Sequence, residues 1–127
     1  MLGISIYPLV SSVEDNMKYI EKAVALGYKR LFTSMLELDD NKEKALKQVN
    51  NYKLLLNRAK ELGMITIVCA DSTVEAKAVA CMDPDIVLAE PTDLIGTGKV
   101  ADDSYTIETV KGLHEVNPDV LVMIASG

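Results

Sequence analysis

The chain has 127 residues, of which 49% are apolar and 25% are charged. This length is typical of one domain, so residues 1–127 are expected to form a single α/β unit with a hydrophobic core. The formal net charge of −6 argues against nucleic acid and anionic membrane surfaces as partners, because both are bound through an excess of Lys and Arg.

Short apolar runs alternate along the chain with longer segments that have helical spacing of their apolar residues. Five strands are expected at residues 2–7, 31–35, 65–70, 86–89 and 120–124. The first three helices are expected to begin at pairs typical of a capping box, namely Ser11 with Glu14, Asp40 with Glu43, and Ser72 with Glu75. The last helix is expected around residues 107–116, after a longer loop at residues 90–103.

Continuous apolar strands that alternate with helices indicate parallel strands in right-handed βαβ units. Two folds have this pattern. One is an open, doubly wound sheet of flavodoxin-like strand order 2-1-3-4-5, and the other is an open segment of a (βα)-barrel with the order 1-2-3-4-5. The flavodoxin-like sheet is slightly favoured, because helices on both faces would bury the strands of one chain without help. A complete barrel is excluded by length, since it needs about 250 residues.

The two cysteines, Cys69 and Cys81, have no spacing typical of a zinc site or a redox pair. Both are expected to be small core residues in a reducing, cytoplasmic compartment. The amino terminus has neither a basic stretch nor a long apolar segment, so no signal peptide or membrane span is expected.

The first half of the chain resembles a bacterial (βα)-barrel family that includes 6-phospho-N-acetylmuramidases. The resemblance covers residues 1–64 and depends on the phrases MLGISIYP, GYKRLFTSML and AKELGM.

Residues 59–127 are similar to archaeal triosephosphate isomerases, through AKELGMITIVCAD, PDIVLAEPTDLIGTGK and VNPDVLVMIASG. The two resemblances meet near residues 59–64. Together they indicate a hybrid of two barrel fragments, engineered or recombined.

The isomerase resemblance implies a set of site residues. It places the catalytic base at Glu90, the lid at residues 91–99, and a phosphate cradle at Gly96, Thr97 and Gly98. Other parts of the isomerase pattern are missing. The first strand, GISIYP, has no electrophilic Lys, the phrase around the catalytic His has no counterpart, and the last phosphate-binding strand of the family would lie beyond residue 127.

Several other residues are candidate functional groups. Asp71 and Glu90 end neighbouring strands and could pair as acid and base, although Asp71 also suits a helix start. His114, the single histidine, is expected on a helix surface. Tyr7, Thr33 and Ser34 are expected at the same rim, where they could bind an anion.

The expected function is therefore a non-catalytic scaffold with at most residual binding of phosphate or sulfate, and with no cofactor or metal. The alternative is a triosephosphate isomerase-like or other phosphosugar-processing enzyme that is completed by self-association. Self-association is itself expected if the strands keep the curvature of a barrel, because one apolar face would then be exposed. A third alternative is a small interaction module that binds a partner along an exposed strand edge.

Overall fold

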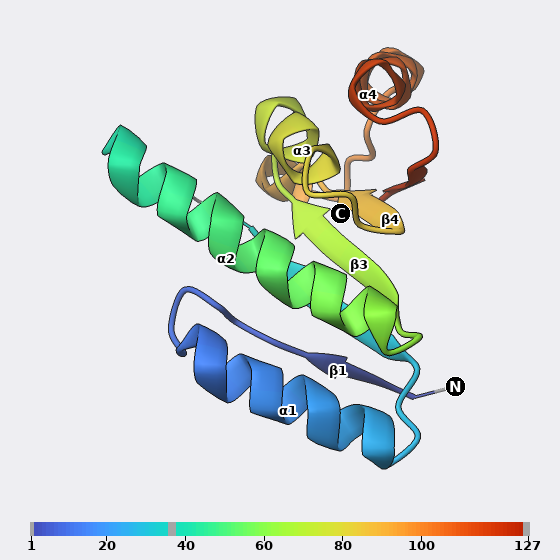
Figure 1. Cartoon of the computed structure of the whole chain (residues 1–127). Helices are drawn as coiled ribbons and strands as arrows, with labels where there is room; N and C mark the ends of the chain where they lie inside the picture. Colours follow the sequence, from blue (N-terminus) through green and yellow to red (C-terminus); the bar gives the residue numbers. More distant parts are fainter. Residues whose placement is uncertain (1, 36–37, 126–127) are drawn as a thin grey trace.

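The computed structural model describes residues 2–35 and 38–125, and within them strands and helices alternate along the chain (Figure 1). The elements in chain order are β1 (Gly3–Ser5), α1 (Val13–Ala25), β2 (Arg30–Ser34), α2 (Lys42–Glu61), β3 (Ile65–Ala70), α3 (Thr73–Ala80), β4 (Ile86–Ala89), a short 3₁₀ helix η1 (Thr92–Leu94), α4 (Asp103–Val116) and β5 (Leu121–Ile124). The prediction of an α/β domain with five strands and four helices is confirmed.

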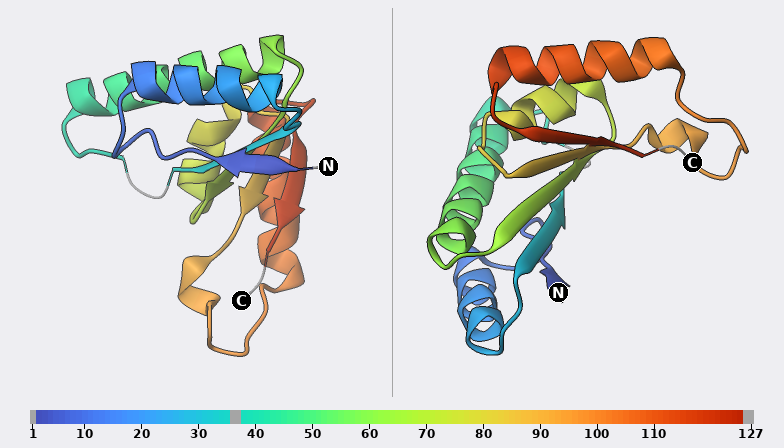
Figure 2. Two further views of the ribbon diagram at one scale, coloured as in Figure 1. Left: turned by 90° about the horizontal axis from the view of Figure 1, so that it is seen from below. Right: turned by 90° about the vertical axis from the view of Figure 1, so that its right-hand side faces the viewer.

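All neighbouring strands pair in parallel, in the order β1-β2-β3-β4-β5. This is the order of a barrel segment, so the prediction of the flavodoxin-like order 2-1-3-4-5 is wrong. Each crossover moves one strand in the same direction, so the right-handed rule for βαβ units places every helix on the same side of the sheet. Figure 2 shows the helices on the convex side of the curved sheet.

The side chains of the strands alternate between two different environments. One set packs against the helices and is almost fully buried: Ile4, Leu31, Val68, Val87 and Ala89 are at most 8% exposed. These residues join the helix stripes, for example Tyr52, Leu55, Leu56 and Ala59 of α2, in one core. The other set points to the open side, which we call the concave face and define by Phe32, Ile65, Ile67, Ile86, Leu88, Leu121 and Met123.

Two of the three predicted helix caps are displaced by one residue, and α4 begins at Asp103, four residues before the expected start. The cap of α1 is Ser12, and that of α2 is Asn41, whose side chain accepts a hydrogen bond from the N–H of Lys44. The neighbouring Ser11 instead donates to the carbonyl of Tyr7. The prediction for Ser72 is confirmed, because its hydroxyl accepts from the N–H of Glu75.

The structure confirms the prediction for one of the two cysteines. Cys69 is buried, as predicted, but Cys81 is exposed at the end of α3 and is not a core residue. Neither is in a disulfide. Among the described residues, no helix has both the length and the apolar character that crossing a membrane requires.

Candidate functional site

Glu90 lies directly after β4, at the edge where the carboxyl ends of the parallel strands meet. Its N–H donates to the carbonyl of Ala70, 3.0 Å away, which holds Glu90 beside the end of β3. Alternation along β4 places Glu90 on the same side as Ile86 and Leu88, that is, on the concave side of the sheet. Catalytic groups of (βα)-barrels occupy this edge of the sheet.

Two groups at the end of β3 lie near the Glu90 carboxylate. Cys69 is on the concave side of β3 and only 6% exposed, and Asp71 follows the strand directly. Burial raises the pKa of the Cys69 thiol, and the negative charges of Glu90 and Asp71 raise it further. The register of β3 and β4 pairs Ala70 with Ala89, so Asp71 and Glu90 follow at neighbouring positions on the two strand ends.

The chemistry available to this cluster is that of carboxylates beside a protonated thiol. The carboxylates can accept a proton or a hydrogen bond from a ligand. The thiol is a weak nucleophile here, because the raised pKa keeps it in the neutral form at pH 7. Within residues 2–35 and 38–125, no three His, Cys, Asp or Glu side chains are arranged to hold a metal ion.

The loop after Glu90 contains the predicted phosphate cradle. It begins with η1 and continues through Gly96 and Gly98, whose φ angles are 76° and 71°. Both glycines therefore occupy the left-handed region, where a Cβ is disfavoured, and apart from their chain neighbours no atom lies within 4 Å of the Cβ position of either. The backbone at these two positions is open to solvent.

Thr97 does not have the predicted role of a free donor. Its N–H and its hydroxyl both donate to the carbonyl of Leu94, at 3.1 and 2.7 Å, and the hydroxyl accepts from the N–H of Lys99. Thr97 thus stabilises the shape of the loop. Within the described part of the chain, the N–H groups of Gly96 and Gly98 have no hydrogen-bond partner.

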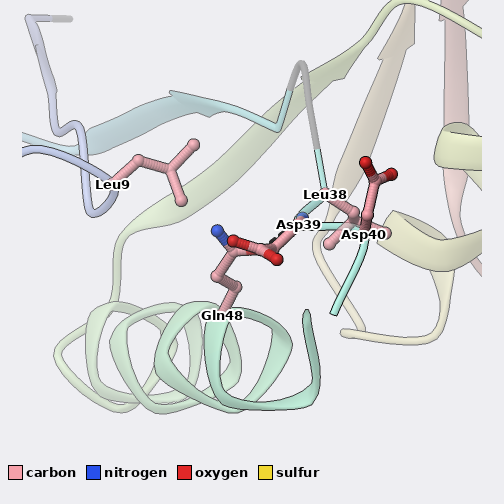
Figure 3. A pocket seen from close by; sticks show the side chains of 5 residues that line it. All are labelled: Leu9, Leu38, Asp39, Asp40 and Gln48. Atoms are coloured by element: carbon pink, nitrogen blue, oxygen red, sulfur yellow. Dashed lines mark hydrogen bonds between the residues drawn. The ribbon is translucent and has the colours of Figure 1, made fainter. Parts of the chain in front are cut away.

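A second part of the same edge was not predicted from the sequence. A cavity of about 370 Å³ lies between the loops that follow β1 and β2, and Figure 3 shows the residues that line it: Leu9, Leu38, Asp39, Asp40 and Gln48. The side-chain oxygen of Gln48 accepts a hydrogen bond from the N–H of Asp39, 3.0 Å away. The adjacent acidic pair after the second strand was the signal in the sequence that could have indicated this cavity.

A smaller, apolar cavity of about 240 Å³ lies beside it, lined by Tyr7, Leu9, Val10, Ser34 and Tyr52. Tyr52 donates its hydroxyl hydrogen to the carbonyl of Ser34 at 2.7 Å, and burial raises its pKa. Tyr7 and Ser34 are thus at the rim, as predicted.

Two of the candidate residues, Thr33 and His114, do not lie at this rim. Thr33 was expected at the rim, but it is 1% exposed on the helix side of β2 and donates to the carbonyl of Ile6 at 2.8 Å. Alternation along the strand points it away from Ser34 and therefore away from any ligand at the concave rim. His114 is exposed on α4, and its Nε2 lies 3.0 Å from the carbonyl of Val120, which directly precedes β5. It is therefore at the amino edge of the sheet, opposite Glu90.

The strand order, the one-sided helices and the loops at the carboxyl edge define an open segment of a (βα)-barrel. Comparison with known proteins identifies the family. The family described as 6-phospho-N-acetylmuramidase, N-terminal, matches residues 2–96. The chain belongs to this family.

Relatives of a second kind are triosephosphate isomerases. That of Methanocaldococcus jannaschii is 40% identical over 76 residues, which cover 58% of this chain and 35% of the relative. That of Pyrobaculum islandicum is 32% identical over 127 residues, which cover 98% of this chain and 55% of the relative. The chain thus spans between about a third and about half of the length of these relatives.

A solved structure agrees with the fold. A crystal structure of an uncharacterized B. cereus protein superimposes with a TM-score of 0.65 at 23% identity, over 97% of this chain and 30% of that one. Both resemblances noted in the sequence are confirmed. They overlap along the chain, because the family match reaches residue 96 and the Pyrobaculum match covers nearly all residues. The junction near residues 59–64 stays a prediction.

Proposed function

We propose that the carboxyl edge of the sheet binds the phosphate group of a phosphorylated sugar, with the N–H groups of Gly96 and Gly98 as donors. The observation that carries the proposal is that both amides are unpartnered on open backbone, in the loop that follows Glu90. Backbone N–H groups in such turns are typical anion ligands. The names of the family and of the isomerases both describe phosphorylated substrates, which supports the same ligand class.

We propose further that one chain alone does not turn over such a ligand. Enolisation requires a base and a polarising donor at the same carbonyl. Glu90 is a suitable base, but His114 lies at the opposite edge, and β1 contains no lysine. The combination of two family resemblances in one short chain supports a recombined or engineered scaffold, and the two free thiols support a cytoplasmic location.

The alternative, a sugar-phosphate isomerase or hydrolase completed by self-association, is supported by the carboxylates of Glu90 and Asp71 beside Cys69. A coupled assay of glyceraldehyde-3-phosphate isomerisation distinguishes the two, with Glu90→Gln as the control. Equal rates for both proteins, at the level of the buffer, support the non-catalytic proposal. A rate that depends on Glu90 contradicts it.

Binding itself is tested by titration of the ¹⁵N-labelled chain with phosphate, followed by NMR, with chloride at the same ionic strength as the control. We expect the amide signals of Gly96 and Gly98 to shift in a saturable way with phosphate and not with chloride. The signal of Thr97 should move less, because its N–H is already bonded within the loop. Unchanged glycine signals at tens of millimolar phosphate would refute the proposal.

A further inference from the structure

The two cavities near the loops that follow β1 and β2 adjoin each other, and we call them together the bipartite site. Leu9, on the loop after β1, lines both cavities. The larger one, of about 370 Å³, has a volume within the range of about 300–1,000 Å³ that is typical of ligand pockets. All the lining residues lie within residues 7–52, inside the segment that the family matches. The phosphate proposal uses none of them.

The larger cavity is negatively charged. Asp39 and Asp40 line it, and within the part of the chain that the structure describes no Lys or Arg side chain lines either cavity. An ionised carboxylate only accepts hydrogen bonds, so the pair favours a ligand group that donates them and is positively charged. A phosphate group would be repelled here, because it carries the same sign of charge.

Hydrogen bonds hold Asp39 in place without a ligand. Its N–H donates to the side-chain oxygen of Gln48 at 3.0 Å, and its Oδ1 accepts from the N–H of Asn41 at 2.8 Å. Figure 3 shows the side chain of Gln48 beside Asp39, with Leu9 on the neighbouring loop. The amide nitrogen of Gln48 and the carboxylate of Asp40 have no hydrogen-bond partner among the described residues. The cavity therefore offers a fixed acceptor, a second acceptor and a donor.

The smaller cavity, of about 240 Å³, is apolar. Tyr52 is 1% exposed, and its hydroxyl donates to the carbonyl of Ser34, so its ring forms a fixed wall. On the loop after β1, by contrast, Tyr7 is 54% exposed, Leu9 45% and Val10 86%. An apolar group of a ligand that covers these side chains removes their surface from water, which is favourable.

We propose that the bipartite site binds a small organic amine. Its primary ammonium group, which has three donors, lies in the larger cavity and pairs with the two aspartates. A hydroxyl next to the ammonium accepts a hydrogen bond from the amide nitrogen of Gln48. An aromatic or branched aliphatic group enters the smaller cavity and packs against Leu9 and Tyr52. The site is separate from the loop after β4, so the proposal does not depend on phosphate binding.

The test is titration of the ¹⁵N-labelled chain with phenylalaninol, which combines an ammonium group, a hydroxyl and a phenyl ring. We expect saturable NMR shifts of the backbone amides of Leu9 and Asp39 and of the side-chain amide of Gln48. Because salt screens ion pairs, the affinity should fall as salt is raised.

Two further compounds test the two halves of the site separately. Ethanolamine lacks the phenyl ring and should bind at least about tenfold more weakly than phenylalaninol, because it leaves the smaller cavity uncovered. The anion 3-phenylpropanoate keeps the ring but has a carboxylate in place of the ammonium. It should cause no saturable shift of the same signals, because the larger cavity repels it.

Variants test the role of charge. Asp39→Asn and Asp40→Asn each remove one negative charge with little change of shape, and each should weaken the binding of phenylalaninol by about threefold to tenfold. The matched control is Glu108→Gln at an exposed position on α4, which makes the same change in net charge and should bind like the wild type. Circular dichroism shows whether each variant is folded. Asp40→Asn serves alone if Asp39→Asn does not fold, since the carboxylate of Asp40 makes no bond within the described residues.

Three results would overturn the proposal. The first is the absence of saturable shifts up to tens of millimolar phenylalaninol. The second is equally tight binding of 3-phenylpropanoate. The third is a folded Asp40→Asn variant that binds phenylalaninol as tightly as Glu108→Gln.

Discussion

The amino edge of the sheet contains a compact hydrogen-bond clasp between Asp85 and Thr66. One carboxylate oxygen of Asp85 accepts from the N–H of Thr66 at 2.8 Å and from its hydroxyl at 3.0 Å, and the N–H of Asp85 donates to the same hydroxyl at 2.9 Å. Thr66 is 0% exposed. The clasp joins the start of β3 to the residue before β4, so we expect it to stabilise the sheet.

The magnitude follows from these contacts. Asp85→Ala removes two hydrogen bonds to a charged acceptor, each worth about 1.5–3 kcal/mol, and leaves the buried N–H of Thr66 unpaired. Because such contributions are not fully additive, we expect a loss of about 2–4 kcal/mol in the free energy of unfolding. For a chain of this length the melting temperature should fall by roughly 8–15 °C.

The assay is urea unfolding at one fixed protein concentration, because association would otherwise change the apparent stability. A double-mutant cycle with Thr66→Val isolates the hydroxyl contact from the N–H contact. We expect the double variant to be less destabilised than the sum of the single variants, by about 1 kcal/mol. The phosphate-dependent NMR shifts of Gly96 and Gly98 should persist in Asp85→Ala, since the clasp lies at the opposite edge. A cost below about 0.5 kcal/mol, or an additive cycle, would refute the reasoning.

Two further predictions concern the rim. Glu90→Gln removes a negative charge that disfavours the thiolate of Cys69, so the pKa of this thiol should fall. In a Cys81→Ser background, iodoacetamide should then modify Cys69 faster at mildly alkaline pH. An unchanged rate would contradict the stated cause of the raised pKa. Tyr52→Phe removes the 2.7 Å hydrogen bond to the carbonyl of Ser34 and should lower the free energy of unfolding by about 1 kcal/mol. In urea unfolding, the midpoint should fall while the m-value stays unchanged. A midpoint equal to that of the wild type would show that this bond contributes nothing to stability.

The sequence predicted strands and helix starts well where the signal, an apolar run or a capping residue, lies within a few neighbouring residues. The strand at Ile65–Ala70 and the helix start at Ser72 match the prediction, because a fully apolar run and a serine cap are local signals. Apolar spacing was a poorer guide to the core. Val74 and Ile107 have helical spacing, yet they are 78% and 65% exposed. Which stripe of a helix is buried depends on the neighbouring helices, and that is not a local property.

The candidate site was also predictable only where it depends on local sequence. The positions of Glu90 and Asp71 at the carboxyl edge followed from strand ends, since parallel strands bring these ends together. The effect of both carboxylates on Cys69, the bonding of Thr97 within its own loop, and the cavity beside Asp39 and Gln48 all depend on contacts between separate segments. No motif in the sequence encodes those contacts.

The sequence by itself determined the α/β class, the number of strands and helices, and the edge of the sheet at which the chemistry-bearing residues gather, because all three follow from local periodicity and from the handedness of βαβ units. The tertiary structure alone decided the strand order, and with it the exposed concave face. Both candidate folds have strands that are apolar along their whole length, so the apolar runs look the same in each. Only the direction of successive crossovers, which is a property of the packed chain, places all four helices on one side.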